Sequence, residues 1–352
     1  MHTQEEVMRV IFRAQEGTAP SKEDCVFLLG LPEDSFEAGL LKVAADTVSR
    51  ERFNNRGILL GQIGIETAPC EGQCKFCSFG KNQTQFSAAR MPDEEILLRA
   101  RAFTDRQDLY ALFLMTMHDF DLRWLLRVVE MVRREIPTET QIVANVGDFD
   151  RSQAAELKAA GVNGAYHVLR LREGTDTILD PEKRKATMRA IREAGLDFYF
   201  CCEPVGPEHT PEELVEQIFV GVEYGCFQHA AMRRVYVPTS PLAPLGQITE
   251  RRLAQVVAVV SLATLNVAET QSIAVHEPNL LGLAAGANTV YAETGANPRD
   301  TESDTSGHRG LDMQACRKML YEAGFSALLK GDGTEAVLDH LYARKQTEKG
   351  EL

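Results

Sequence analysis

The sequence predicts an α/β protein built as a parallel (β/α)8 barrel of the TIM type, with a helical cap at its N-terminus. From residue 58 onward, eight short apolar or alternating runs are separated by longer amphipathic runs with helical spacing. Several of the helical runs end at a glycine that can cap a helix, namely Gly161, Gly195 and Gly225. Strands that alternate with helices favour a closed parallel barrel, and an open doubly wound sheet is the alternative.

The N-terminal part of the chain predicts a helical extension that precedes the barrel. Helical patterns cover residues 3–15, 21–29 and 33–51, and Ser21 is a suitable N-cap for the second pattern because acidic residues follow it. We therefore divide the chain into an N-terminal extension at 1–55, a barrel at 56–340 that includes the C-terminal segment, and a tail at 341–352.

Eight segments are predicted as strands of the barrel. In chain order they are ILLGQIGI (58–65), YALFLMT (110–116), QIVANVG (141–147), GAYHVLR (164–170), LDFYFCC (196–202), AAMRRVYVP (230–238), SIAVH (272–276) and NTVYAE (288–293). In a parallel barrel the functional loops follow the carboxyl ends of the strands. Side chains at the ends of the first, fourth, fifth and seventh segments should therefore converge on one face.

Composition and charge exclude several classes of protein. The chain has 352 residues, of which 44% are hydrophobic, and a formal net charge of -13, so a general surface for binding nucleic acid is not expected. No window approaches the roughly 18 apolar residues of a membrane-spanning helix, and the start of the chain lacks the features of a signal peptide. We therefore expect a cytoplasmic protein, with no membrane partner, whose eight cysteines are kept as thiols.

Three cysteines follow the first predicted strand at close spacing. Cys70, Cys74 and Cys77 lie in the segment ETAPCEGQCKFCSFG, which contains no fourth cysteine and no histidine. A structural zinc site generally takes four protein ligands, whereas a [4Fe–4S] cluster is held by cysteine thiolates, normally one per iron. Three thiolates would leave one iron of such a cluster free to bind another molecule. A zinc site completed by a distant residue is the alternative.

This motif, with Phe76 directly before its last cysteine, resembles that of the radical S-adenosylmethionine (SAM) superfamily. In this family the free iron chelates SAM, and an electron from the cluster cleaves SAM to a 5'-deoxyadenosyl radical that abstracts hydrogen from a C–H bond. The late segment AAGANTVYAETGANPRDTESDT is similar to the branch that contains biotin synthase, the diiron-hydrogenase maturase and methylornithine synthase. The resemblance implies a [4Fe–4S] cluster, SAM and a reductant such as flavodoxin or ferredoxin.

The resemblance also implies which side chains hold SAM. In the family, a glutamate after the fourth strand contacts the amino group of SAM and an arginine in the following helix contacts the carboxylate. Glu173 and Arg184 occupy these places, and their charges complement the two groups. Thr116 follows the second strand, where the family has a glycine-rich stretch, and with Phe76 it completes the expected cofactor contacts. Solvated charges are the alternative for Glu173 and Arg184.

The later strands supply further candidates. His276 ends the seventh strand and is a candidate proton relay, and Cys202 ends the fifth strand and is a candidate catalytic residue. Candidate substrate contacts are Arg233, Tyr291 and Glu293. Cys201 and Cys202 alternate across a strand, so one of them should face the barrel interior. With Cys226 they are also candidates for an auxiliary iron–sulfur cluster.

The sequence therefore predicts an enzyme that forms a deoxyadenosyl radical and acts on a small molecule or a carrier-bound acyl group. Sulfur insertion or a related C–H functionalisation, similar to biotin or lipoyl synthesis, is the first hypothesis and would make the enzyme sulfurtransferase-like. The second and third strands lack the cysteines that hold the sulfur-donating cluster of biotin synthase. Rearrangement of an amino-acid carbon skeleton and maturation of a metallocofactor are therefore alternatives. A non-enzymatic zinc or iron–sulfur binding protein is the alternative from another class.

Overall fold

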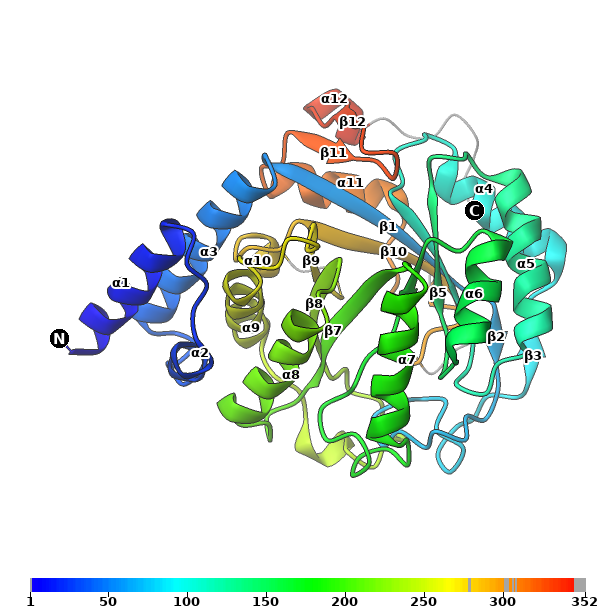
Figure 1. Ribbon diagram of the computed structural model, residues 1–352, viewed down its shortest axis with the longest axis horizontal. Helices are drawn as coiled ribbons and strands as arrows, with labels where there is room; N and C mark the ends of the chain where they lie inside the picture. The colour runs from blue at the N-terminus through cyan, green and yellow to red at the C-terminus, as the bar shows by residue number, and fades with distance from the viewer. Residues whose placement is uncertain (1, 278–279, 301–303, 306, 308, 345–352) are drawn as a thin grey trace.

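The computed structural model describes residues 2–277, 280–300, 304–305, 307 and 309–344. Figure 1 shows a barrel at the centre of the molecule, with the first helices projecting on one side. A small separate sheet joins β2 (Glu66–Thr67) and β3 (Ala89–Arg90) in antiparallel pairing. Within the described part of the chain, no helix combines the length and the apolar composition that crossing a bilayer requires.

The central sheet is a closed parallel barrel. Its strands are β1 (Arg56–Gly64), β4 (Ala111–Met115), β5 (Gln141–Asn145), β6 (Gly164–Tyr166), β7 (Asp197–Val205), β8 (Gln228–Arg233), β9 (Ser272–Val275) and β10 (Thr289–Gly295). Each strand pairs in parallel with the next, and β10 returns to pair with β1, with Ile58 opposite Thr289. The eight strands predicted from the sequence are confirmed, and closure of the barrel excludes the open sheet.

Helices connect the strands and cover the outside of the barrel (Figure 1). They are α4 (Asp93–Thr104), α5 (Leu122–Glu135), α6 (Arg151–Ala160), α7 (Pro181–Glu193), α8 (Pro211–Glu223), α9 (Glu250–Ala263), α10 (Leu280–Leu283) and α11 (Met313–Glu322). Local signals fix their ends. Asp150 caps α6 through a reciprocal bond with Gln153, and Gly161 ends the same helix with a φ of 109°, which favours glycine. The connections place the carboxyl ends of the strands at one end of the barrel.

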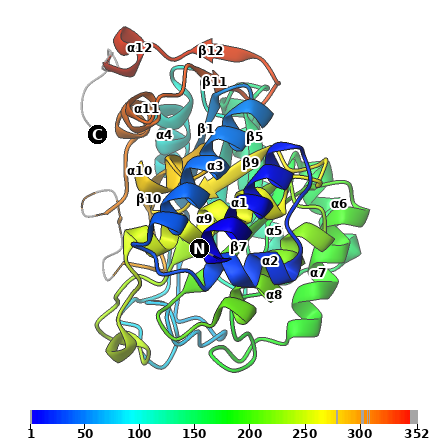
Figure 2. The same cartoon turned by 90° about the vertical axis from the view of Figure 1, so that its left-hand side faces the viewer.

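The N-terminal helices are α1 (His2–Gln15), α2 (Lys22–Leu29) and α3 (Phe36–Arg52). They pack at the side of the barrel, where α2 contacts α8 and α9 and α3 contacts α9 (Figure 2). Gln255 on α9 donates hydrogen bonds to the carbonyl oxygens of Leu28 at 2.8 Å and Leu31 at 3.0 Å. The helical extension is therefore fastened to the barrel through backbone acceptors.

The C-terminal segment adds two strands that the sequence pattern did not predict. β11 (Ala327–Leu329) pairs in parallel with the first residues of β1, and β12 (Glu335–Val337) pairs antiparallel with β11. The helix α12 (His340–Arg344) begins just before the segment predicted as a tail, of which residues 345–352 lie outside the described part. Tyr342 on α12 donates to Asp108 at 3.0 Å, so the start of the predicted tail is bound to the barrel.

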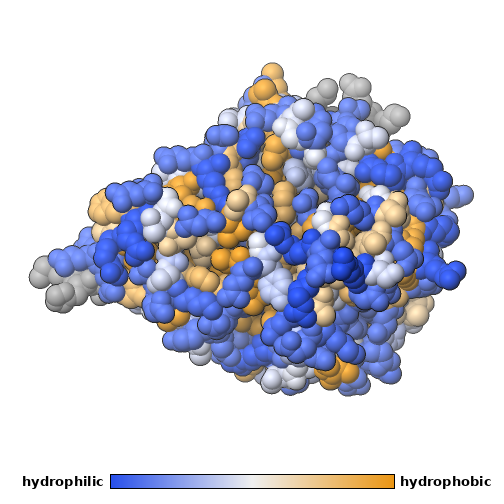
Figure 3. Space-filling view, viewed as in Figure 1, coloured by the Kyte–Doolittle hydropathy of each residue, from blue (hydrophilic) through white to orange (hydrophobic). Residues whose placement is uncertain are grey.

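Aromatic side chains fill the middle of the barrel. Phe113 on β4 contacts Tyr199 and Tyr291 edge to face, at centroid distances of 5.2 and 5.4 Å. The Tyr291 hydroxyl accepts a hydrogen bond from Gln228 Nε2 at 2.6 Å, so it is satisfied inside the core. Hydrophilic side chains cover most of the outer face seen in Figure 3. The packed aromatic layer forms the floor of the space at the carboxyl ends of the strands.

Candidate active site

The three clustered cysteines lie on a loop between β2 and β3, at the carboxyl end of the barrel. The Cys70 N–H donates to the carbonyl oxygen of Phe79 at 2.8 Å, and the Cys70 carbonyl oxygen accepts from Lys81 at 3.1 Å. The Cys77 N–H donates to the Cys74 carbonyl oxygen at 3.1 Å. The loop is therefore folded back on itself, and Cys70, Cys74 and Cys77 all line the same cavity.

Loops that follow three other strands hold the cysteine loop in place. The Lys75 N–H donates to the carbonyl oxygen of Asp176, after β6, at 2.9 Å. The Lys75 carbonyl oxygen in turn accepts from the hydroxyl of Ser240, after β8. The Ser78 N–H donates to the carbonyl oxygen of Pro298, after β10, at 2.8 Å. The position of the thiols is thus set by the barrel and not by the loop alone.

The three thiols are free, and burial opposes the ionisation of Cys74 and Cys77 in the absence of a bound metal. None of them forms a disulfide. The Phe79 N–H donates to Cys77 Sγ at 3.3 Å, a contact that stabilises negative charge on the sulfur. Burial raises the pKa of Cys74 to about 12, and the charge of Arg170 opposes this rise. In the part of the chain that the structure describes, no three His, Cys, Asp or Glu side chains converge as ligands of one metal ion would. Soft sulfur donors around a shared cavity suit an iron–sulfur cluster, whose binding removes the thiol protons.

The cavity extends from the cysteine loop into the carboxyl end of the barrel. Its empty space, counted out into the solvent at the open mouth, is about 1130 Å³. Apolar and aromatic side chains form much of the wall, among them Phe113, Met115, Met117, Tyr166, Met232 and Tyr291. The site therefore combines sulfur ligands at its mouth with an apolar interior.

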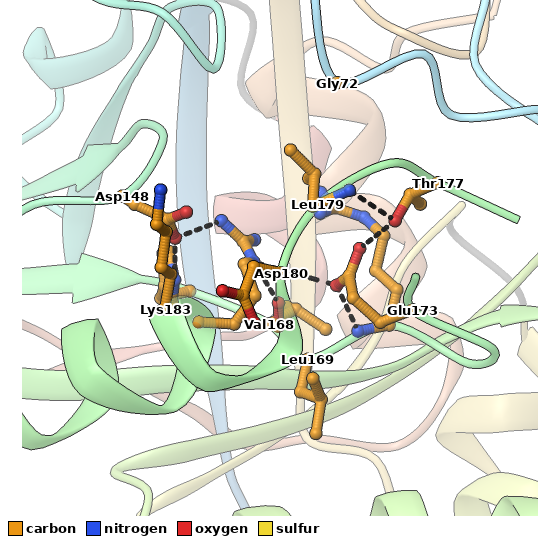
Figure 4. A network of polar contacts seen from close by, with 12 residues as sticks. Gly72, Asp148, Val168, Leu169, Glu173, Thr177, Leu179, Asp180 and Lys183 are labelled. Carbon is orange, nitrogen blue, oxygen red and sulfur yellow. Dashed lines mark hydrogen bonds and ion pairs between the residues drawn. The ribbon is translucent and has the colours of Figure 1, made fainter. Parts of the chain in front are cut away.

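Glu173 and Arg184 lie next to each other beside this cavity. Figure 4 shows the side chains of Glu173 and Thr177 pointing toward each other. Glu173 Oε2 accepts from the Arg170 N–H at 2.8 Å, and Glu173 Oε1 accepts from the Thr177 hydroxyl at 2.7 Å. Arg184 Nε lies 3.7 Å from Glu173 Oε2 and donates to the Val168 carbonyl oxygen at 3.0 Å. Arg184 lines the cavity, whereas Glu173 lies just behind the lining residues.

Asp148, after β5, connects Arg184 to two histidines. Its carboxylate lies 2.8 Å from Arg184 Nη1, 3.1 Å from His167 Nε2 and 3.9 Å from His118 Nε2. Burial acts to raise the pKa of Asp148, but the contact with His167 and the charge of Arg184 bring it well below its usual value. Burial and Arg184 lower the pKa of His167 to about 3. At pH 7 Asp148 is therefore ionised, His167 is neutral, and the Arg184 guanidinium is held in one direction.

Phe76 and Thr116, the other residues predicted to contact SAM, both line the cavity. Thr116 is buried directly after β4, and its N–H donates to the Asn145 carbonyl oxygen at 3.0 Å. Its hydroxyl donates to the Met117 carbonyl oxygen at 3.2 Å. Because the hydroxyl proton is used within the chain, the oxygen of Thr116 can act as an acceptor toward a bound molecule.

Three of the four residues predicted on β8 to β10 line the cavity, namely His276, Tyr291 and Arg233. The ring of His276 stacks on Tyr291 with a centroid distance of 4.6 Å. Arg233 Nε is paired with Glu277 at 3.1 Å. The fourth residue, Glu293, is buried behind the wall and accepts from Gln62 Nε2 at 3.2 Å. Glu293 therefore reaches the cavity only through its neighbours.

The structure does not bring Cys202 to the cavity. Side chains alternate along β7, and Tyr199 and Glu203 face the interior, so Cys201 shares their side and Cys202 points toward the helices. Cys226 lies before β8, at the opposite end of the barrel, where its carbonyl oxygen accepts from Thr270 at 2.7 Å. The candidate set of Cys201, Cys202 and Cys226 is thus spread over two faces and two ends of the sheet.

Charged residues near the cavity that sequence reasoning missed include Asp148, Arg170 and Arg299. Arg170 and Arg299 line the cavity, and Asp148 touches Arg184 from outside it. Each follows the carboxyl end of a barrel strand, which is the position where functional side chains gather in this fold. A charged residue at the end of a predicted strand or within a few residues after it was the signal that could have found them.

The barrel is closed and parallel, a loop with three thiols follows its first strand, and one cavity connects this loop to the interior of the barrel. Together these features define the site of a radical SAM enzyme. Residues 67–219 match the model of the radical SAM superfamily, so this part of the chain carries a radical SAM domain. The family predicted from the cysteine motif is therefore confirmed.

Sequence and structural relatives agree with this assignment. Biotin synthase from Desulfovibrio desulfuricans is 25% identical over 309 residues, which cover 78% of this chain and 88% of the relative. The crystal structure of methylornithine synthase (PylB) matches with a TM-score of 0.76 at 18% identity, covering 90% of this chain and 96% of that one. The hydrogenase maturase HydG from Carboxydothermus hydrogenoformans matches with a TM-score of 0.73 at 18% identity, covering 92% and 79%. At these identities the structural matches show the shared fold.

Proposed function

We propose that this protein is a radical SAM enzyme that binds SAM beside the cysteine loop and abstracts hydrogen from a small molecule held deeper in the barrel. The observation that carries this proposal is the continuous cavity from Cys70, Cys74 and Cys77 to Tyr291 and His276. A reactive radical must be formed next to its substrate and away from other reactants, and one shared cavity meets this requirement.

The side chains around the cavity fit the cluster and SAM at different places. The three thiols would hold the cluster through one iron each. Arg184 would bind the carboxylate of SAM, and Glu173 would bind its ammonium group after a small side-chain movement. Thr116 and Phe76 would contact SAM from the β4 and cysteine loops. When bound, the cluster and SAM supply the electron and the 5'-deoxyadenosyl radical.

Apolar side chains shield the space between the cysteine loop and the barrel. Phe79, Met115, Met117 and Ala296 form a small buried cluster against which Cys70 and Cys77 pack. Such a wall limits the access of water to the thiols. These apolar side chains would therefore act by excluding water from the cysteine loop.

Two subclasses of reaction differ in their need for a sulfur donor. In the described residues, the cysteines that line the cavity are Cys70, Cys74 and Cys77. This favours a reaction in which the substrate radical rearranges or fragments without sulfur from the protein, as in a mutase, a lyase or a maturase. Sulfur insertion is the second candidate, and the similarity to biotin synthase over 78% of the chain favours it. In both cases we propose a cytoplasmic enzyme with a protein reductant such as flavodoxin or ferredoxin.

The test is anaerobic reconstitution with iron and sulfide, followed by SAM and dithionite. We expect 5'-deoxyadenosine to form slowly without substrate and faster with one member of a substrate panel. The Cys74→Ala variant should form none, whereas Cys316→Ala, which removes a buried thiol remote from the motif, should behave as the wild type. Wild-type protein that carries a cluster but never cleaves SAM would contradict the proposal.

A further inference from the structure

The ionisable side chains that line the cavity are strongly biased toward positive charge. Five arginines line it, namely Arg170, Arg184, Arg233, Arg234 and Arg299. Among the described residues, Glu203 is the only carboxylate that does so. The whole chain has a formal net charge of -13, so this bias is local. A cavity wall of one sign concentrates ligands of the opposite sign.

Most of these arginines have partners that use their donors. Arg170 is paired with Glu203 at 3.2 Å, and Arg233 with Glu277 at 3.1 Å. Arg234 is bound by both carboxylate oxygens of Glu208 and also donates to a carbonyl oxygen. Arg184 is bound by Asp148 and is already assigned to SAM. Each of these four guanidinium groups is thus paired with a carboxylate of the protein, and among the described residues Arg170 is held through its Nε alone.

Arg299 differs from them because three different acceptors fix its guanidinium. Its Nε donates to Asn297 Oδ1 at 2.9 Å, its Nη1 lies 2.6 Å from His276 Nδ1, and its Nη2 donates to Glu293 Oε1 at 2.5 Å. Each Nη carries a second N–H for which no described residue is an acceptor. Arg299 lines the cavity, whereas Glu293 lies behind the lining residues. The positively charged member of this ion pair is therefore the one that faces the cavity.

His276 adds a second donor beside Arg299. Its Nδ1 accepts from the Glu277 N–H at 3.1 Å and faces Arg299 Nη1, and both of these groups can only donate. The ring proton of His276 therefore sits on Nε2, which lies 3.6 Å from Glu293 Oε1, beyond hydrogen-bond distance. Burial and the charges of Arg299 and Arg309 lower the pKa of His276 well below its usual value, so the ring stays neutral.

From this arrangement we infer that Arg299, with His276 beside it, is the substrate-anchoring site and that the substrate is an aliphatic carboxylate. The inference rests on the proposed function, because it assumes that a substrate occupies this cavity. A planar guanidinium matches the two oxygens of a carboxylate, and Asn297, His276 and Glu293 hold it before binding. Phe113, Met232 and Tyr291 would contact the apolar part of the molecule.

The experiment compares hexanoate with hexanamide, which has the same length but no charge. Each is titrated by ligand-observed NMR into the reconstituted, SAM-loaded protein without reductant. We expect hexanoate to bind at least ten-fold more tightly than hexanamide. Arg299→Gln should abolish this preference, and Arg299→Lys should keep part of it. Arg234→Gln, which removes a guanidinium already occupied by Glu208, should leave the preference intact.

Equal binding of the two probes to the wild type would overturn the inference without any variant. So would a preference that survives in folded Arg299→Gln protein, checked by its unfolding midpoint. Dithionite is then added to the same samples, and the formation of 5'-deoxyadenosine is measured. Cleavage of SAM without a carboxylate preference would refute the anchoring site alone, and a preference without cleavage would refute the proposed function alone.

Discussion

The backbone N–H of Ser78 donates to the carbonyl oxygen of Pro298 at 2.8 Å, which joins the cysteine loop to the loop that carries Arg299. These loops follow β1 and β10, the two strands that close the barrel. The proposed places of SAM and of the substrate are therefore linked by one direct backbone contact. Changes at the ends of these two strands should disturb both places together.

Of the residues at the ends of β1 and β10, we expect Gly64 to be the most sensitive to substitution. It ends β1, and a Cβ at this position would stand 1.9 Å from the Ala296 carbonyl oxygen. We expect Gly64→Ala to lower the free energy of unfolding by about 3 kcal/mol, because backbone must move to relieve the clash. Gly39→Ala in α3 is the control, since nothing lies within 4 Å of its new methyl group. It should raise stability by up to about 1 kcal/mol in urea titrations. Equal stability of the two variants would contradict the close approach.

Cluster content should separate the two groups of cysteines. We expect Cys77→Ala to lose the cluster and Cys226→Ala to keep about four irons per chain, as one [4Fe–4S] cluster requires. The physical reason is position, since Cys77 lines the cavity and Cys226 lies at the other end of the barrel. Iron analysis after anaerobic reconstitution provides the measurement. A lower iron content in Cys226→Ala would instead support an auxiliary cluster.

The hydroxyl of Thr177 should matter for SAM affinity. It donates to Glu173 at 2.7 Å and accepts from the N–H groups of Gly174 and Leu179. We expect Thr177→Val to raise the KM for SAM about ten-fold, or about 1.4 kcal/mol, near the lower end of the roughly 1.5–3 kcal/mol that a hydrogen bond to a charged group contributes. The kcat should change little, and Thr177→Ser should resemble the wild type. If serine and valine give the same KM, the hydroxyl does not position Glu173.

His229 should make stability depend on pH. Its ring is buried between β8 and α8, with Nε2 3.0 Å from the Ile218 carbonyl oxygen, and burial lowers its pKa from 6.5 to about 4. The unfolded chain takes up this proton at higher pH than the folded chain. The stabilisation is therefore complete above about pH 6.5 and is lost as pH falls toward 4. Between pH 6 and 5 this group should cost about 1 kcal/mol per pH unit, and urea unfolding of His229→Gln should show a slope smaller by that amount. Unchanged slopes would show that the ring is not neutral in the folded state.

The barrel strands could be predicted from the sequence because each is a short apolar run between helical patterns. The β11–β12 hairpin could not, since its strands are three residues each and owe their pairing to the edge of β1. Closure of the barrel was likewise beyond the sequence, because a parallel sheet has the same apolar pattern whether it is open or closed.

Site residues that are close together in the sequence could be predicted, whereas those that the fold brings together from distant loops could not. The three cysteines are close in sequence, so their joint role was readable. Arg299 is recognisable as a site residue only through its contacts with His276 and Glu293, which lie on other parts of the barrel. The strand FYFCC is apolar throughout, and such a run does not show whether Cys201 or Cys202 faces the interior of the barrel.

The anchoring of the cysteine loop has a consequence for how the mature protein is assembled. Ser240, which holds the carbonyl oxygen of Lys75, is 165 positions away along the chain. Pro298, which accepts from the Ser78 N–H, comes still later in the chain, after the last strand of the barrel. The cysteine loop therefore gains its full set of contacts only when the ring of strands is complete, and we expect iron and sulfide to be delivered to the finished polypeptide rather than to one still emerging from the ribosome.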